Sequence, residues 1–412
     1  MTRRLGLCAA LVLTLASCGD TSSQSDPGSL RGRITVQAAG GEGELKALQQ
    51  LVDAFEAANL GVAVEFIGLA EQGEHIGKLG TAFAGGNPPD VFLLNYRRFG
   101  RFAAQGVLDL PAGLKADDYY GAAIEAFSVD GQLLCLPQNA SSTVVYYNPA
   151  LFRRAGVAVP AAGWTMNDMR DRARALKAKA VKSIGFETSF RSVPPIVWAL
   201  GGEVVDDTNH PTKITLDTMP GREALAYLKD LVNAGVTATD EAADPAEDRF
   251  ARGELAMFLD SRRAVPAFRK SEKLDFDVAP LPRGTTSATL LASDAYCVAK
   301  KSDNIALARA FAQYAVGPVG GAVLAESGRT VPSLRALAQS PVFLAPGKKP
   351  ASSQVWLDVL DSARRLPSVA QWNEAESTAS DVLEQYFADK TTLDAAVTTI
   401  ARDSTRLLAE EG

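Results

Sequence analysis

Strand-like and helix-like segments alternate along most of the chain, and this order constrains the fold more than any other feature. Residues 34–36 and 62–66 have the apolar pattern of strands, and residues 44–59 between them carry one apolar helical stripe. Residues 90–94 form an apolar run that predicts a buried strand. Short strands alternating with helices are typical of parallel sheets with helices packed on their faces. We therefore expect an α/β fold.

Later segments follow the same pattern. Thr165 and Asp168 approximate a capping box, which predicts that a helix begins after Thr165. Residues 216–235 predict a further helix that ends at Gly235. Residues 78–84 predict only a short helix. The chain has 412 residues, more than one ordinary core organises, so we expect two lobes of roughly 150–200 residues each.

The first 18 residues differ from the rest. Arg3 and Arg4 precede an apolar run over residues 5–16, which is too short to span a bilayer but has the length of a signal-peptide core. The run ends in the sequence LASC, which resembles the bacterial lipobox and predicts a lipid on Cys18. We expect a signal peptide over 1–17 and a lipidated, flexible tether over 18–32, so that the protein is held outside the cytoplasm on the cell membrane. The alternative is an ordinary secretory signal that contains a cysteine by chance.

Composition and motifs exclude several functions. The net charge of −6 and the lack of a Lys/Arg block argue against nucleic-acid binding, since neutralising phosphates requires a basic face. His75 and His210 are the only histidines, and both lie in polar surroundings where we expect them to be solvated. No hydrolase or zinc-protease motif is present, and the Cys, His and carboxylate residues lack metal-ligand spacing. We expect no metal, no cofactor and no enzymatic activity.

Five groups of segments, in this order, resemble the bacterial extracellular solute-binding proteins of carbohydrate-type ABC importers, which include the maltose-binding protein. The first group is GGNPPDV with FGRFAAQGVLDL, and the second is GQLLCLP with YYNPALF. The others are GGE before the helix at 224–235, then FARGELAM, then APLP with residues 308–314 and 328–332. Together they span about residues 34–408.

This resemblance implies a type II periplasmic-binding-protein fold, in which two lobes close on a ligand held between them. Lobe 1 is expected over 33–140 and 296–331, and lobe 2 over 141–295 and 332–412. The chain is expected to cross between the lobes near residues 138–142, 290–296 and 330–333. The implied partners are a small-molecule ligand and the membrane subunits of an ABC importer, and we expect a monomer.

Candidate ligand residues follow from strand ends and from the resemblance. Asn95, Tyr96, Arg97 and Arg98 come directly after the buried strand at 90–94, and their amide, ring and guanidinium groups suit the recognition of hydroxyl groups. The alternative is an exposed polar turn. Glu42 lies in the turn before the first long helix, where it either faces the cleft or only complements the helix dipole.

The other candidates lie at the expected crossings or where the family places cleft residues. They are Gln138, Asn139, Ser141, Arg191, Ser261, Arg263, Ser293, Asp294, Arg329 and Trp372. Many relatives have Gly-Pro-Trp where this chain has Ser261, Arg262 and Arg263, so a tryptophan that would stack on a sugar is missing here.

The charge of the ligand is left open. Arg97, Arg191, Arg263 and Arg329 fall where relatives place cleft residues, and guanidinium groups bind carboxylates and phosphates in a bidentate manner. An anionic solute, such as a glycerophosphodiester or an acidic sugar, is therefore an alternative to a neutral sugar. If acidic side chains pair with these arginines, a neutral sugar is expected. A secreted glycan hydrolase is a third, less favoured alternative.

Cys135 and Cys297 are the two cysteines that follow Cys18. The resemblance places their strands close together, and secretion favours oxidation. A disulfide and two buried thiols are both open at this point.

Overall fold

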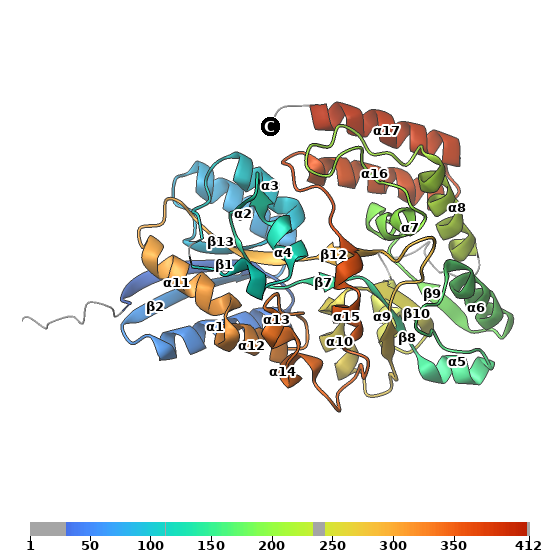
Figure 1. Cartoon of the computed structure of the whole chain (residues 1–412), viewed down its shortest axis with the longest axis horizontal. Coiled ribbons are helices and arrows are strands. Elements are labelled where there is room, and N and C mark those ends of the chain that lie inside the picture. The colour runs from blue at the N-terminus through green and yellow to red at the C-terminus, as the bar shows by residue number, and fades with distance from the viewer. Residues whose placement is uncertain (1–29, 112, 234–243, 410–412) are drawn as a thin grey trace, which may run out of the picture.

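The computed structural model describes residues 30–111, 113–233 and 244–409, and these residues form two lobes (Figure 1). Lobe 1 is defined here as the part built around a five-stranded sheet, and lobe 2 as the part built around a four-stranded sheet. Helices pack around both sheets. The α/β class and the two-lobed architecture expected from the sequence are confirmed.

The sheet of lobe 1 has the strand order β2-β1-β3-β13-β6. β1 is parallel to β2 and β3, while β13 is antiparallel to both of its neighbours. The strands are β1 (Gly32–Ala39), β2 (Val62–Leu69), β3 (Val91–Asn95), β6 (Leu136–Pro137) and β13 (Asp294–Val298). The helices are α1 (Glu42–Ala58), α2 (Gln72–Ala84), α3 (Tyr96–Ala104), α4 (Gly121–Ala126), α11 (Ile305–Val316) and α12 (Pro318–Glu326). The apolar stripe of α1 is buried, and the Phe55 ring meets the Phe311 ring of α11 edge-on at 5.2 Å.

The sheet of lobe 2 has the order β11-β8-β10-β9, and only β9 and β10 are parallel. The strands are β8 (Val144–Tyr147), β9 (Lys182–Gly185), β10 (Leu255–Asp260) and β11 (Asp277–Ala279). The helices are α5 (Pro149–Ala155), α6 (Met166–Ala178), α7 (Pro194–Ala199), α8 (Met219–Asn233), α9 (Ala246–Ala251), α10 (Val265–Lys270), α16 (Trp372–Phe387) and α17 (Leu393–Ala409). Tyr146 lies at the centre of an aromatic cluster in which the Phe268 and Trp356 rings meet it edge-on.

Shorter elements connect these units. They are the sheet β14-β12-β7, made of β7 (Ser141–Ser142), β12 (Thr289–Ala292) and β14 (Ala363–Arg364), and the hairpin of β4 (Ser128–Val129) and β5 (Gln132–Leu133). The short helices are α13 (Arg335–Ala338), α14 (Pro341–Leu344) and α15 (Val355–Asp358), with 3-10 turns η1 (Ala116–Asp118), η2 (Phe190–Ser192), η4 (Arg262–Ala264) and η5 (Leu360–Ser362). Although α13 and α14 follow the third expected crossing, both contact α12 of lobe 1.

Three chain segments run side by side between the lobes. The Gln138 amide donates to the Asp294 carbonyl at 2.7 Å, and the Ala140 amide donates to the Val331 carbonyl at 2.9 Å. β7 continues the chain from β6, and β12 leads into β13, so neighbouring strands of these segments belong to different sheets. The three segments therefore meet where the expected crossings were placed, and the lobe boundaries themselves stay a prediction.

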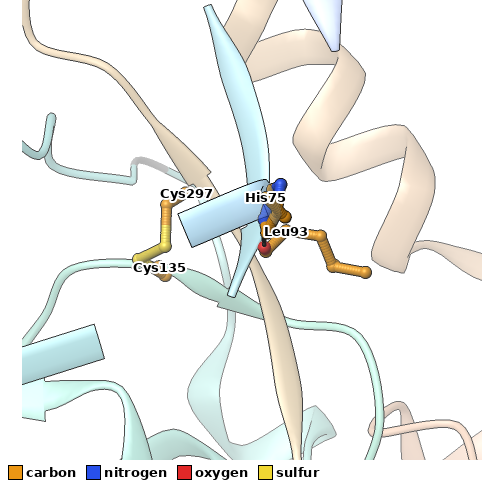
Figure 2. Close-up of a disulfide and its surroundings, with 4 residues drawn as sticks. All are labelled: His75, Leu93, Cys135 and Cys297. Atoms are coloured by element: carbon orange, nitrogen blue, oxygen red, sulfur yellow. Dashed lines mark hydrogen bonds between the residues drawn. A yellow bond between two sulfur atoms is a disulfide. The ribbon is translucent and has the colours of Figure 1, made fainter. Parts of the chain in front are cut away.

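The two cysteines are joined. The Cys135–Cys297 disulfide links the segment before β6 to the adjacent strand β13, with Cα atoms 4.5 Å apart (Figure 2). The two cysteines are 162 residues apart in the sequence, and the bond ties the segment entering β6 to β13. Of the two alternatives that the sequence left open, the structure therefore has the disulfide.

His75 is not solvated as the sequence predicted but 1% exposed, on α2 beneath β3 (Figure 2). Its Nε2 lies 2.8 Å from the Leu93 carbonyl and its Nδ1 lies 3.0 Å from Gln37 Nε2. A carbonyl can only accept, so we assign the proton to Nε2 and leave Nδ1 to accept from Gln37. Burial lowers the pKa of this imidazole, which favours the same neutral form.

Residues 1–29, which include the predicted signal peptide and Cys18, lie outside the described residues. Within the described ranges, no helix combines the length and the apolar character needed to cross a membrane.

Candidate functional site

The candidate site is a cavity of about 350 Å³ beside the carboxyl ends of the parallel strands β9 and β10. Ligands of α/β proteins commonly bind at such strand ends. The lining combines charged groups with an apolar wall, and we call it the β9–β10 pocket. It is lined by Thr143, Glu187, Arg191, Ser192, Pro195, Ile196, Pro245, Ala246, Glu247, Phe258, Leu259, Asp260, Arg263, Leu281 and Leu290.

The two arginines of this pocket are paired with acids. Arg263 Nη1 lies 2.8 Å from Glu247 Oε2, and a second ion pair joins Arg263 to Asp260. Arg191 Nη1 lies 3.5 Å from Glu187 Oε2. The pocket therefore offers both hydrogen-bond donors and acceptors, and both of its arginines are paired within it, since three carboxylates face two guanidinium groups.

A hydrogen-bonded network lies at the crossings. Asp294 accepts from Asn95 Nδ2 at 3.1 Å and from Asn139 Nδ2 at 3.0 Å. Gln138 Nε2 donates to the Tyr296 hydroxyl, and the Ser293 hydroxyl donates to the Asn139 carbonyl. The structure thus brings together five of the predicted site residues, Asn95, Gln138, Asn139, Ser293 and Asp294. Because these side chains bond one another, the network fixes the crossing segments whatever it contributes to a ligand.

Glu44, rather than Glu42, is the glutamate of the first turn of α1 that points inward. Glu42 is exposed, whereas the Glu44 side chain is only 10% exposed and its Oε2 lies 2.8 Å from Arg329 Nη2. Burial raises the pKa of the Glu44 carboxyl to about 7; Arg329 opposes the shift, and the nearby Asp294 adds to it. Glu44 and Glu42 lie two residues apart on the helix, so their side chains point in different directions, and a ligand contact by Glu42 stays a prediction.

We predict that Glu44 makes the protein less stable as the pH rises from about 4.5 to 7. Over this range the folded state keeps a proton on Glu44 that the unfolded state releases, so the free energy of unfolding falls with pH, by up to about 3 kcal/mol from this group. Urea unfolding of the wild type and of Glu44→Gln at several pH values measures the difference. The exposed Glu42→Gln serves as the control and should follow the wild type. Parallel curves for Glu44→Gln and the wild type would contradict the assignment.

The two arginines at the start of α3 have different surroundings. Arg97 Nη1 is 2.5 Å from Glu376 Oε1 of α16, so it forms an ion pair between the lobes. Arg98 is half-buried, and no ion pair joins it to any residue of the described ranges. Burial and the neighbouring Arg97 lower the pKa of Arg98. Arg98 therefore has no ion-pair partner in the described ranges, and it does not line the β9–β10 pocket.

Several candidates make structural contacts, and their predicted contacts with a ligand stay predictions. Tyr96 and Trp372 are both 0% exposed; Tyr96 accepts from the Leu366 amide, and Trp372 packs against Phe190. Tyr96 and Arg98 lie two residues apart on α3, so their side chains point in different directions. Ser141 is buried and accepts from the Arg262 amide, and the Ser261 carbonyl accepts from the Tyr146 hydroxyl. None of these four lines the β9–β10 pocket.

Five acidic residues of this region were not predicted from the sequence: Glu44, Glu187, Glu247, Asp260 and Glu376. A signal existed for two of them, because Glu187 follows β9 closely and Asp260 ends β10. Glu376 lies in the middle of a C-terminal helix, and no local pattern distinguishes it from other helical glutamates. Within the described ranges no group of three His, Cys, Asp or Glu side chains is arranged to hold a metal ion.

Two sheets, three adjacent crossings and a polar pocket at strand ends define a two-lobed binding protein. The model of the bacterial extracellular solute-binding protein family matches residues 39–322. The chain belongs to this family. Its members are binding proteins that act outside the cytoplasm.

Related proteins agree in length and fold. The galactooligosaccharide-binding protein of Bacillus subtilis is 24% identical over 403 residues, which cover 93% of this chain and 91% of that protein. The ABC substrate-binding protein of Listeria monocytogenes in complex with cycloalternan has a TM-score of 0.83 at 23% identity, over 92% of this chain and 100% of the other. A maltose-bound MalE3 structure from T. maritima has a TM-score of 0.78 at 20% identity, over 91% and 99% of the two chains.

Proposed function

We propose that the protein captures a neutral carbohydrate between its lobes and delivers it to the membrane subunits of an ABC importer. The observation that carries this proposal is the pairing of arginines with acids. Each of the four arginines that could have indicated an anionic ligand has a carboxylate partner: Arg97 has Glu376, Arg191 has Glu187, Arg263 has Asp260 and Glu247, and Arg329 has Glu44. An added anion would have to displace these partners, whereas sugar hydroxyls can bond to both members of such pairs.

The pocket itself supports a carbohydrate. Pro195, Ile196 and Phe258 offer apolar surface beside the charged groups, and sugars present apolar faces as well as hydroxyl edges. Of the related proteins named above, one is a galactooligosaccharide-binding protein, and the two solved structures hold cycloalternan and maltose. We propose Arg98, Arg191, Asp260, Arg263 and Glu187 as ligand contacts, with no catalytic step and with the protein acting as a monomer.

Binding is tested by calorimetry and thermal shift with maltose, a galactooligosaccharide and cycloalternan, beside a sugar phosphate and a glycerophosphodiester. A neutral saccharide present at 100 times its Kd should stabilise the protein by about 2.7 kcal/mol, with little dependence on salt. Stabilisation by the anionic compounds alone would contradict the proposal. Chromatography of the saccharides after incubation should show no cleavage, and products would instead indicate a hydrolase.

Arg98→Gln is predicted to weaken binding of the stabilising saccharide about 10- to 100-fold. The variant loses a charged hydrogen-bond donor, and a bond to a charged group contributes about 1.5–3 kcal/mol. Calorimetry measures the loss. Arg174→Gln is the matched control, since it removes an exposed guanidinium that bonds Asp230 between α6 and α8, away from the pocket. Equal affinities of Arg98→Gln and Arg174→Gln would remove Arg98 from the site.

We also propose that lipid on Cys18 anchors the mature chain and that residues 18–32 are its tether. The apolar run, the LASC sequence and the extracellular family support this. Cys18→Ala is predicted to move the protein from the washed membrane fraction to the soluble fraction, as measured by immunoblotting. Retention of this variant on membranes would mean that another feature holds it there.

The lobe boundaries are proposed as 33–140 with 296–331 for lobe 1, and 141–295 with 332–412 for lobe 2. The change of sheet between β6 and β7, and between β12 and β13, supports the first two crossings. The bridge between Asn139 and Pro332 supports the third.

A further inference from the structure

Helix α3 of lobe 1 meets α16 of lobe 2 through one buried ion pair. The Arg97 side chain is 19% exposed and that of Glu376 is 10% exposed, so solvent and salt screen the pair only weakly. Other charges face this pair: Glu187 of the β9–β10 pocket and Asp294 of the crossings also lie close enough to Arg97 to favour its charge. Arg97 thus lies among acids of lobe 2 and of the crossings, with its ion pair to Glu376.

Both members of the pair are held in place by neighbours. Asn95 Oδ1 accepts from the Arg97 backbone amide at 3.2 Å and from Arg97 Nε at 3.3 Å. Trp372 Nε1 donates to Glu376 Oε2 at 3.0 Å, which leaves Oε1 for Arg97. Two side chains fixed beforehand lose little conformational freedom when they pair, so this contact favours association more than a typical surface pair does.

The surrounding surface is fitted closely. The Tyr96 hydroxyl accepts from the Leu366 amide at 3.2 Å, across the same junction. A Cβ at Gly100 would lie 1.5 Å from the Ser368 carbonyl oxygen. Only glycine at this position therefore allows α3 to lie this close to the segment before α16. Together with the ion pair, these contacts form a noncovalent connection between the lobes, separate from the three chain crossings.

This connection is linked to the ligand pocket through η2. The Phe190 ring packs against Trp372 at 5.8 Å, and the Phe190 amide donates to Ser380 Oγ at 3.1 Å. The next residues, Arg191 and Ser192, line the β9–β10 pocket. The carboxylate that holds Arg97 therefore belongs to the same packed unit as two pocket residues.

We propose that Arg97 and Glu376 are positioning residues that latch the two lobes and set the fraction of molecules in the closed state, without binding the ligand. A ligand enclosed by both lobes binds the closed state more tightly, so its apparent Kd varies inversely with the closed fraction. The effect on affinity depends on the proposed function, whereas the latch itself acts with or without a ligand.

The test is a double-mutant cycle of Arg97→Gln, Glu376→Gln and the variant with both changes. Small-angle X-ray scattering of the ligand-free proteins measures lobe separation, and hydrogen exchange of the peptide over residues 365–372 measures opening at the Leu366 amide. Each single change leaves a buried charge unpaired, so it should increase the radius of gyration. It should also raise the exchange rate of the Leu366 amide by about tenfold or more. The double change should be no worse than either single one. Arg174→Gln controls for the loss of a guanidinium and should match the wild type.

The latch would be overturned if the single variants have the radius of gyration and the exchange rate of the wild type. It would also be overturned if the effect of the double variant equals the sum of the effects of the two single variants. Affinity for maltose, the probe saccharide, should fall in proportion to the closed fraction, about tenfold for a tenfold loss. If the wild type binds no saccharide but the cycle behaves as expected, the carbohydrate proposal fails while the latch stands.

Discussion

Arg262→Ala is expected to lower the free energy of unfolding by about 3–5 kcal/mol. Arg262 is 0% exposed, with its guanidinium carbon 4.2 Å from the centre of the Phe343 ring and 4.7 Å from that of Trp356. Its Nε donates to the Gly328 carbonyl at 2.9 Å and its Nη2 to the Phe343 carbonyl at 3.2 Å. Alanine would empty the space between the rings and leave both carbonyls without this donor. Urea unfolding followed by tryptophan fluorescence measures the loss.

A second substitution separates packing from hydrogen bonding. Methionine fills much of the same volume, so Arg262→Met should lose only the hydrogen bonds, about 1–3 kcal/mol. Burial lowers the pKa of Arg262 to about 9, because a charge at this position is costly. Removing the charge relieves this cost, which limits how far the Arg262→Met variant is destabilised. Arg174→Ala is the control, since this arginine and its partner Asp230 lie at the surface, and its change in stability should stay below about 1 kcal/mol. Equal losses for Arg262→Ala and Arg174→Ala would show that the buried contacts contribute little.

Replacing Cys135 and Cys297 together with alanine is expected to lower the free energy of unfolding by about 2–5 kcal/mol. The bond closes a loop of 162 residues, which contains the whole four-stranded sheet, and restricts the unfolded chain accordingly. It also joins β13 to the segment that enters β6, at the edge of the sheet that carries the crossings. Chemical unfolding of the oxidised wild type and the double variant gives the difference.

The reductant supplies the control for this experiment. Dithiothreitol should lower the stability of the wild type towards that of the Cys135→Ala/Cys297→Ala variant and leave the variant unchanged. If the wild type unfolds at the same denaturant concentration with and without the reductant, the bond does not contribute as expected.

Local sequence patterns predicted helices correctly where a capping residue or an apolar stripe determines the helix. The predicted capping box is present, with Thr165 and Asp168 bonded to each other's backbone amides, and α1 covers Glu42–Ala58 against the expected 44–59. The helix α2 was predicted only over 78–84 but begins at Gln72. Gly73, Gly77 and Gly80 lower its helix propensity, and packing of the helix beside β1 compensates.

The candidate site was less predictable because its geometry depends on partners far apart in the chain. Strand ends indicated where polar groups gather, and Asn95, Asn139 and Asp294 do meet there. Nothing local indicated that Arg97 would pair with a residue 279 positions later, nor that Arg262 rather than Arg263 would be buried. Which arginines are paired and which are buried depends on these long-range contacts.

The order of the strands has a consequence for how the chain matures as it emerges from a translocation pore. The four-stranded sheet is complete once Ala279 has emerged, whereas the sheet nearest the N-terminus lacks β13, the strand between β3 and β6, until Val298 has emerged. The sheet that begins second can therefore be completed first, while β3 and β6 wait unjoined in the other sheet. The helices α16 and α17 join the second lobe only after both sheets are complete. Unpaired strands are prone to aggregate, so this interval is the stage at which a secretion chaperone would help most.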